Sequence, residues 1–191
     1  MDLCTRKAGL RQQIKQRLPC KRTAESDAWS RAACEHFCRT EAFDRARSVM
    51  VFLSLPGEIE TSLALERCWQ VGKTVLVPRV DWERHEIDAI ALTPDTVTSL
   101  HRYGLREPSG GEAFEPRGID LVAVPGLAFD AVGRRLGRGA GFYDRFLPRA
   151  SNATRCGLAW EVQFVEEVPA GENDVRLDLL ATETGIRQFP F

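Results

Sequence analysis

The chain has no long apolar run, no large excess of charge of either sign and no CxxC pair of cysteines. No uninterrupted apolar stretch approaches the roughly 20 residues that a membrane-spanning helix needs, so we expect no membrane partner. The start, Met1-Asp2-Leu3-Cys4, carries an acid and no apolar run, which predicts no signal peptide. With 26 Lys and Arg against 27 Asp and Glu, the net charge is -1, which argues against a nucleic-acid partner. Any attraction for phosphate must therefore be local.

Six cysteines are scattered along the sequence without a CxxC motif: Cys4, Cys20, Cys34, Cys38, Cys68 and Cys156. Cys34 and Cys38 are four residues apart and would share one helix face. We interpret them as small buried hydrophobes rather than as metal ligands. Reduced thiols are typical of a cytoplasm, so we expect a soluble, cytoplasmic protein.

The 191 residues are enough for one sizeable core, and we expect a single domain over 1–191. Apolar periodicity predicts helices over 3–18, ended by Pro19, and from Ser26 towards Ala42, with a further helix over 61–71. Strands are predicted over 48–53, 74–77 (stopped by Pro78), 87–92, 119–124, 156–160 and 179–182. Residues 93–118, rich in Pro and Gly, predict a long irregular connection. The order predicts an α/β fold with a mainly parallel central sheet, helices on both faces and ligands at the carboxyl ends of the strands.

The most informative segment is Arg134-Arg135-Leu136-Gly137-Arg138-Gly139-Ala140-Gly141-Phe142-Tyr143-Asp144, before a predicted helix over 142–147. Three alternating glycines let the backbone approach a ligand closely, and successive N–H groups with the helix N-terminus can hold phosphate oxygens. Arg135 and Arg138 add positive charge. The segment matches neither a G-x-x-x-x-G-K-[ST] loop nor a G-x-G-x-x-G turn. On spacing alone the alternative is a mobile surface loop with solvated arginines, so the pattern predicts phosphate without naming a fold.

Acidic residues follow the loop and the strand over 48–53. Asp144 is a candidate Mg²⁺ ligand, because one or two carboxylates plus substrate phosphates usually hold this ion, although an Asp at a helix start is also an ordinary dipole partner. Glu58 and Glu60 are two residues apart and would point in opposite directions in an extended segment. We interpret Glu58 as the site residue and Glu60 as the acid that starts a helix beside a Thr61 cap.

Several segments of the sequence together resemble the 5-formyltetrahydrofolate cyclo-ligase, or methenyltetrahydrofolate synthetase, family. They are 53–61 (Leu-Ser-Leu-Pro-Gly-Glu-Ile-Glu-Thr), 124–130 (Val-Pro-Gly-Leu-Ala-Phe-Asp), Gly133 with 135–144, and 172–174 (Glu-Asn-Asp). The resemblance implies an α/β fold of the sugar-phosphate isomerase and CoA-transferase-like group. It also implies an enzyme that uses ATP and Mg²⁺ to close a ring on 5-formyltetrahydrofolate, free or polyglutamylated. We expect this enzyme to be a monomer.

The resemblance also implies roles for individual residues. Lys7 and Arg11 resemble the N-terminal ATP contacts of the family, and its main phosphate loop corresponds to Arg135, Leu136, Gly137, Arg138, Gly139, Ala140, Gly141, Phe142 and Tyr143. Leu53, Glu58 and Tyr103 fall where the folate is held, with Tyr103 covering the pterin. Asp144 and Asp174 resemble the magnesium ligands. We assign the catalytic role to Arg138, because phosphoryl transfer asks the protein mainly for positioning and charge stabilisation.

The loop departs from the family pattern at two positions. Ala140 stands where relatives often have Gly or Lys, and Phe142 stands where they usually have Tyr. Alanine would fit poorly if position 140 needed a positive φ. These departures motivate one alternative, a non-catalytic folate or nucleotide binder with the same fold. A sugar-phosphate isomerase or transferase is a second alternative, but it leaves the two separated aspartates unexplained.

Overall fold

A central sheet of eight strands forms the frame of the molecule in a computed structural model that describes residues 2–19, 21–100, 104 and 106–190. Its strand order is β12 (Gly185–Gln188), β11 (Leu179–Thr182), β10 (Thr154–Leu158), β7 (Leu121–Val124), β1 (Ser48–Met50), β2 (Thr74–Asp81), β3 (Glu86–Ala91) and β6 (Ala113–Phe114). The five strands from β11 to β2 are parallel, whereas β12, β3 and β6 join antiparallel at the edges. The predicted mainly parallel sheet is confirmed.

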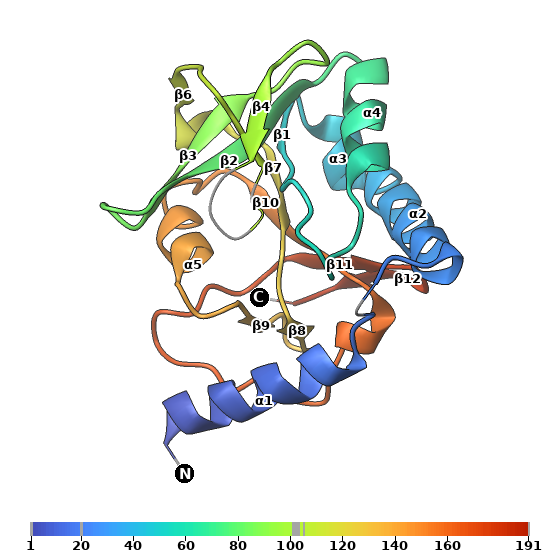
Figure 1. Cartoon of the computed structure of the whole chain (residues 1–191), viewed down its shortest axis with the longest axis vertical. Coiled ribbons are helices and arrows are strands. Elements are labelled where there is room, and N and C mark those ends of the chain that lie inside the picture. The colour runs from blue at the N-terminus through green and yellow to red at the C-terminus, as the bar shows by residue number, and fades with distance from the viewer. Residues whose placement is uncertain (1, 20, 101–103, 105, 191) are drawn as a thin grey trace.

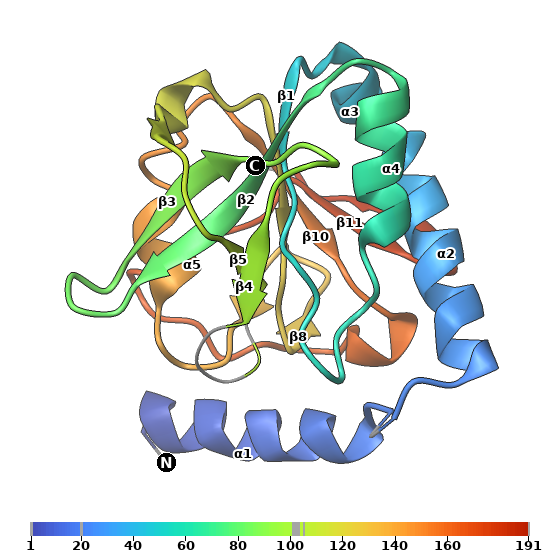
Figure 2. The ribbon, with the colours of Figure 1, turned by 45° about the horizontal axis from the view of Figure 1, so that its top comes forward.

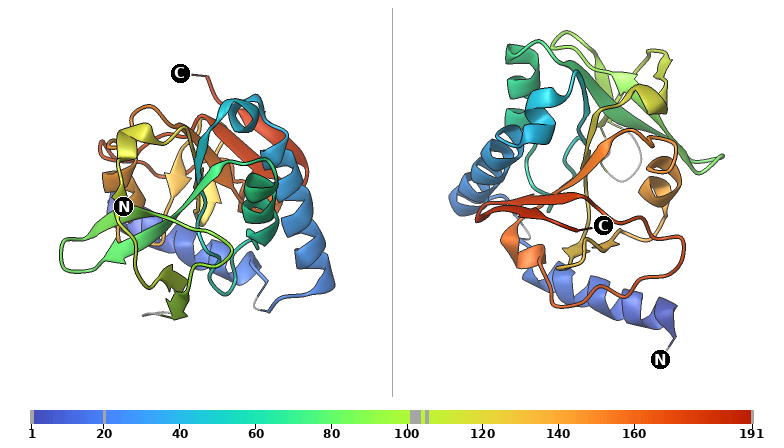
Figure 3. Two further views of the ribbon diagram at one scale, coloured as in Figure 1. Left: turned by 90° about the horizontal axis from the view of Figure 1, so that it is seen from above. Right: turned by 180° about the vertical axis from the view of Figure 1, so that it is seen from behind.

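Alternate residues of the central strands face two separate hydrophobic clusters. Val49 and Val51 join the cluster under α2 (Ala24–Cys38) and α4 (Ser62–Gln70), while Met50 joins the opposite cluster, which includes Phe146 of α5 (Phe142–Phe146). Figures 1 and 3 show α2 and α4 on one side of the sheet and α5 on the other. Helices therefore lie on both faces as predicted, but one face has only this short helix and irregular segments for cover.

Helix α1 (Leu3–Arg17) lies across the end of the sheet towards which the parallel strands run (Figure 2). Asp2 begins it, since its Oδ1 accepts a hydrogen bond from Thr5 N at 3.0 Å. Ile14 is fully buried and anchors the helix to the same cluster as α2 and α4. The helix ends before Pro19, as the sequence predicts, because Leu18 is already extended.

The helix predicted from Ser26 to Ala42 is wrong at both ends. Helix α2 begins at Ala24, because Thr23 and Ser26 hydrogen-bond each other's backbone in a capping box. It ends at Cys38, and Thr40 then accepts a hydrogen bond from Phe43 N to start α3 (Glu41–Arg45). A second cap inside the predicted helix thus divides it into two.

Pro78 does not stop its strand, contrary to the prediction. Leu92 N donates to Val75 O, so by the alternation of an antiparallel ladder the nitrogen of Pro78 faces away from β3. On that side β1 has already ended at Met50, which pairs with Leu76. The proline therefore costs no ladder hydrogen bond, and β2 continues to Asp81.

Residues 93–118 hold more regular structure than the predicted irregular connection. They form a hairpin of β4 (Thr98–Leu100) and β5 (Arg106–Pro108), the edge strand β6 and a 3-10 turn over Pro116–Gly118. The sequence also gave no prediction of the two-residue hairpin β8 (Ala128–Phe129) and β9 (Arg135–Leu136), or of β12. The two-residue strands β8 and β9 have too few residues to show a period of two, and β12 (Gly-Ile-Arg-Gln) has no apolar run.

The five cysteines within the described residues are free, and Cys34, Cys68 and Cys156 are buried. Burial raises the pKa of the Cys34 and Cys68 thiols to about 12. These thiols are therefore protonated at neutral pH and act as small apolar groups. The prediction of a buried thiol is confirmed for Cys34, whereas Cys38 is only half-buried. No group of three or more His, Cys, Asp or Glu in the described part of the chain could hold a metal ion, and no helix there is long and apolar enough to cross a membrane.

Asp130 fixes the turn that leads into the glycine-rich segment. Its side chain is buried, with Oδ1 accepting hydrogen bonds from Val132 N and Arg134 N and Oδ2 accepting one from Val168 N. Gly133 takes a φ of 77° in this turn, and a Cβ there would lie 2.6 Å from the Leu177 carbonyl oxygen, so only glycine fits. The turn thereby joins the β8–β9 hairpin to the segment around Val168.

Replacing Asp130 by Ala should lower the free energy of unfolding by about 3 kcal/mol or more, because three backbone N–H groups lose a charged acceptor. Urea denaturation followed by circular dichroism measures the change. Asp95→Ala, at an exposed acid, is the matched control and should change stability by less than about 0.5 kcal/mol. Equal shifts in the two variants would contradict the role of Asp130.

Candidate functional site

The glycine-rich segment over 137–141 connects β9 to α5, and both of these elements lie above α1 in Figure 1. Gly139 and Gly141 take φ values of 118° and 70°, and Gly141 is the residue from which α5 starts. His85 is the one non-glycine residue with a positive φ among those described, so Ala140 has an ordinary backbone conformation. The steric objection to alanine at this position therefore does not apply.

Helix α1 brings Arg11 to this loop and Lys7 to Asp174. Arg11 Nε donates to the Gly137 carbonyl oxygen at 2.9 Å, and a Cβ on Gly139 would lie 3.6 Å from Arg11 Cζ. Lys7 Nζ donates to both carboxylate oxygens of Asp174, at 2.7 and 2.5 Å. The predicted ATP contacts from the N-terminus thus lie against the predicted phosphate loop and a predicted metal ligand.

Asp174 is held ionised at the end of a tight turn. Its Oδ2 accepts a hydrogen bond from Gly171 N at 2.6 Å. Burial alone would raise the pKa of Asp174, but the Lys7 and Gly171 hydrogen bonds and the charges of Lys7 and Arg135 lower it overall. The carboxylate therefore stays negative well below neutral pH, and it lies within electrostatic reach of Arg135.

Arg135 points inward and orients the second predicted metal ligand. Its side chain is 3% exposed, with Nη2 donating to Asp144 Oδ1 at 2.6 Å and Nη1 to the Pro125 carbonyl oxygen at 3.2 Å. Its guanidinium also lies 5.8 Å from the centre of the Tyr143 ring. Asp144 and Asp174 are thus linked through the charge of one buried arginine.

Arg138 and Glu58 form an ion pair between two loops. Arg138 Nε donates to Glu58 Oε1 at 2.7 Å, and Glu58 Oε2 accepts from Leu55 N at 3.0 Å. The Glu58 side chain is 13% exposed and that of Arg138 is 43% exposed. The structure therefore brings the predicted folate residue next to the predicted catalytic residue.

Two buried polar atoms at this place have no hydrogen-bond partner among the described residues, namely Tyr143 Oη and Arg135 Nε. Burial, together with the nearby Glu58 charge, raises the pKa of the Tyr143 hydroxyl well above its usual range. The hydroxyl is therefore protonated at neutral pH and can donate a hydrogen bond. Unpaired buried donors are rare in folded proteins and are typical of ligand sites.

Phe142 fixes the start of α5 against the turn between β2 and β3. Its ring meets the Trp82 ring edge-on at 5.2 Å between centroids and stacks on His85 at 6.3 Å. The Arg145 guanidinium lies 5.5 Å from its centre. Phe142 therefore acts through packing, and the tyrosine hydroxyl usual in relatives is not needed for these contacts.

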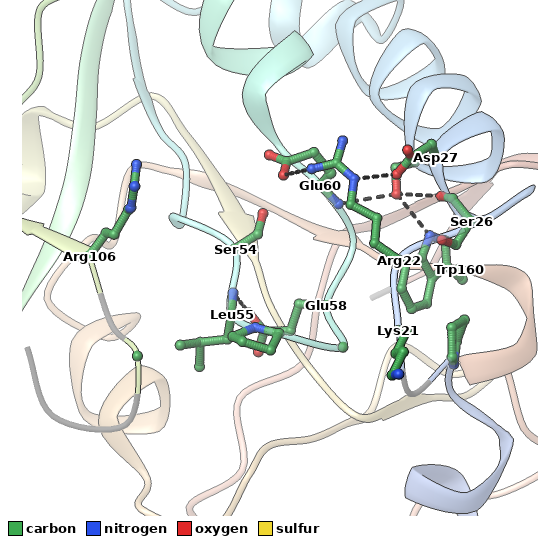
Figure 4. Close-up of a pocket in the computed structure, with 15 residues that line it drawn as sticks. Lys21, Arg22, Ser26, Asp27, Ser54, Leu55, Glu58, Glu60, Arg106 and Trp160 are labelled. Atoms are coloured by element: carbon green, nitrogen blue, oxygen red, sulfur yellow. Dashed lines mark hydrogen bonds and ion pairs between the residues drawn. The ribbon is translucent and has the colours of Figure 1, made fainter. Parts of the chain in front are cut away.

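A cavity of about 370 Å³ opens beside Glu58, between the loop after β1 and the start of α2 (Figure 4). Ser54, Leu55 and Glu58 line one side and Trp160 another, and Lys21, Arg22 and Arg106 border it. Leu53 is half-buried and packs against the core under α2 and α4. Tyr103 lies outside the described residues, although Gly104 lines the cavity.

Sequence reasoning missed the residues that border this cavity. Arg22 forms ion pairs with Asp27 and with Glu60, the latter at 2.8 Å. Glu60 Oε1 also accepts from Ser62 N and so caps α4, whereas the Thr61 hydroxyl donates to the Phe52 carbonyl oxygen and caps nothing. The helix-start role predicted for Glu60 is confirmed, and the Thr61 side-chain cap is wrong. Nothing in the local sequence around Lys21 or Arg106 marks them as cavity residues.

Replacing Lys7 by Met should lower the free energy of unfolding at pH 7 by about 1 to 2 kcal/mol, because Asp174 loses its charged donor. The pKa of Asp174 is lowered in the folded chain, so this stabilisation is present above the ordinary pKa of an aspartate. It is lost as the pH falls through the lower folded value. Urea denaturation of the native chain and of the Lys7→Met chain should show the difference at pH 7, and the difference should shrink as the pH falls below the ordinary pKa of an aspartate.

Arg6→Met is the matched control on the same helix. The Arg6–Glu167 pair is largely exposed, and its loss should cost less than about 0.5 kcal/mol. A Lys7→Met difference that stays constant from pH 7 to pH 3 would show that the ion pair with Asp174 is not its source.

Comparisons with known proteins point to one family. The model of the 5-formyltetrahydrofolate cyclo-ligase family matches residues 4–183. The 5-formyltetrahydrofolate cyclo-ligase of Mus musculus is 30% identical over 188 residues, covering 90% of this chain and 91% of that protein. The enzyme of the same name from Escherichia coli K12 is 31% identical over 146 residues, covering 74% and 80%.

Solved structures of similar fold carry a related name. The 5,10-methenyltetrahydrofolate synthetase of Aquifex aeolicus superimposes with a TM-score of 0.84 at 27% identity, covering 97% of this chain and 93% of that one. A synthetase of the same name from Mycoplasma pneumoniae, at 22% identity, has a TM-score of 0.74 and supports the fold. Because the family model spans almost all of its residues and a 30% identical relative covers nine-tenths of it, the chain belongs to the 5-formyltetrahydrofolate cyclo-ligase family.

Proposed function

We propose that the chain converts 5-formyltetrahydrofolate and ATP into 5,10-methenyltetrahydrofolate, ADP and phosphate. Family membership supports the reaction. The observation that carries the proposal is that α1 places Arg11 on the glycine loop and Lys7 on Asp174, while Arg138 of the same loop pairs with Glu58. Basic groups for a triphosphate and a carboxylate for a pterin thus lie within one site.

The chemistry explains why ATP is needed. The N5-formyl carbon is amide-like, and direct attack by N10 would have to expel hydroxide or oxide. Transfer of the γ-phosphoryl group to the formyl oxygen converts that oxygen into a good leaving group. N10 then attacks the carbon, the C–O bond breaks with departure of phosphate, and the new C–N bond closes the ring. The protein has to position the reactants and stabilise negative charge.

The α1 and loop residues suit the triphosphate. Arg11 and Arg138 are cations at the loop, and Lys7 is a third cation at Asp174. Two glycines at positive φ let the loop backbone turn N–H groups towards phosphate oxygens. Arg135 is almost fully buried, so we propose that it serves ATP indirectly, by orienting Asp144. Arg138 is exposed enough to turn towards a phosphate and is the proposed catalytic group.

The donor set fits a magnesium ion. Asp144 and Asp174 are two carboxylates under the influence of one arginine, and Mg²⁺ is usually held by one or two carboxylates together with substrate phosphates. Bound there, the ion would supply charge neutralisation of the phosphates. Lys7 and Arg135 hold the two carboxylates in fixed positions.

At the folate end, we propose that Glu58 accepts hydrogen bonds from the pterin and that Leu53 shapes the wall behind it. Tyr143 Oη, a buried donor without a partner among the described residues, suits the formyl or phosphoryl oxygen. Lys21 and Arg106 at the mouth of the cavity suit the carboxylates of a glutamate tail, and therefore a polyglutamylated substrate as well. The Tyr103 contact, the monomeric state and the cytoplasmic location stay predictions.

The test is a spectrophotometric assay with 5-formyltetrahydrofolate, ATP and Mg²⁺. A rise in near-ultraviolet absorbance from the methenyl product is expected, and none when ATP is left out. Folded protein that gives no rise would exclude the enzyme. Calorimetry that then showed folate binding without turnover would favour the non-catalytic binder. One reason for that alternative was that alanine would fit poorly at a positive φ, and this reason is removed because Ala140 has no positive φ.

Asp144→Asn should raise the Mg²⁺ concentration needed for half-maximal rate, on the order of tenfold, because one of two anionic ligands is lost. A magnesium titration at saturating ATP and folate measures it. Asp95→Asn, remote from the loop, is the control and should leave the titration unchanged. An unchanged titration for Asp144→Asn would remove this residue from the proposed ligand set.

A further inference from the structure

One ion pair joins the two loops that the proposed function assigns to different substrates. Arg138, from the glycine loop, donates to Glu58, from the loop after β1, across 80 positions of sequence. Under the proposed function Arg138 serves ATP and Glu58 serves the folate. ATP therefore has to draw Arg138 away from Glu58, and the folate has to draw Glu58 away from Arg138.

The two partners differ in how easily they can give up the pair. Arg138 is 43% exposed and can turn into solvent or towards a phosphate. Glu58 is mostly buried, and without Arg138 its remaining hydrogen bond within the described part of the chain is the one from Leu55 N. A buried carboxylate that loses its counter-ion is costly unless new donors reach it. The amino and ring N–H groups of a pterin are donors of that kind.

We infer, on the basis of the proposed function, that the Arg138–Glu58 pair couples the two substrates. A folate that hydrogen-bonds Glu58 releases Arg138 for the triphosphate, and ATP that takes Arg138 leaves Glu58 in need of the pterin donors. Each substrate then raises the affinity for the other by the same factor, as linkage requires. Glu58 keeps the affinity for ATP low until the folate is bound.

The sharpest test is the affinity of Glu58→Gln for a nucleotide without folate. The neutral amide cannot hold Arg138 as an ion, so the variant should bind β,γ-imido-ATP with Mg²⁺ about two- to fivefold more tightly than the native chain, by isothermal titration calorimetry. Glu60→Gln, two residues away and paired with Arg22, is the matched control with unchanged affinity. A Glu58→Gln affinity equal to or weaker than native overturns the inference.

The second measurement is the coupling itself. Saturating 5-formyltetrahydrofolate should lower the Kd of the native chain for β,γ-imido-ATP about two- to fivefold. Arg138→Met should abolish this effect and bind the folate alone more tightly than native. Arg11→Met should weaken the nucleotide yet keep the effect, since Arg11 bonds Gly137 and not Glu58.

The outcomes separate this inference from the proposed function. A native chain that turns over its substrates but shows no mutual effect on binding, or an Arg138→Met chain that keeps the effect, overturns the coupling and leaves the enzyme in place. A native chain that neither turns over nor binds the two ligands overturns both.

Discussion

The site depends on three ion pairs that hold basic side chains at the carboxyl end of the sheet. Lys7 pairs with Asp174, Arg135 with Asp144 and Arg138 with Glu58. Two of these pairs join segments far apart in sequence, α1 to the turn before β11 and the glycine loop to the loop after β1. A chain with a net charge of -1 can in this way concentrate positive charge locally without repulsion between its cations.

Pairing also orders the site before any ligand arrives. A long lysine or arginine side chain that is already fixed loses less conformational entropy when it meets a phosphate. Because each cation is already paired, a phosphate can bind it only when the cation leaves its carboxylate or is shared between the carboxylate and the phosphate. Arg135 is too deeply buried for such an exchange, whereas Arg138 is not. Burial thus divides the basic residues into those that hold the carboxylates in place and one that can move.

The sequence predicted the strands of the sheet centre, because fully buried parallel strands read as short apolar runs, as over 121–124. It predicted α1 from apolar residues at helical spacing and from Pro19 at its end, while the Asp2 cap at its start was not used. It did not predict that Arg135 would be buried, because nothing local distinguishes an inward arginine from a phosphate contact. The cavity border at Lys21 and Arg106 escaped prediction because the fold alone brings these distant loops together.

The two departures of the glycine loop have different physical meanings. Ala140 lies between two glycines that take the positive φ angles, and its carbonyl oxygen accepts a hydrogen bond from Arg145 Nη2 at 2.8 Å, so the alanine leaves the loop conformation intact. What it removes is the positive charge that a lysine would bring. Arg11 lies over the neighbouring Gly139 and provides a cation at that place from another element. Phe142 in turn gains ring contacts that fix the first turn of α5. The loop therefore keeps its geometry through glycine and aromatic packing, and it depends on α1 for part of its charge.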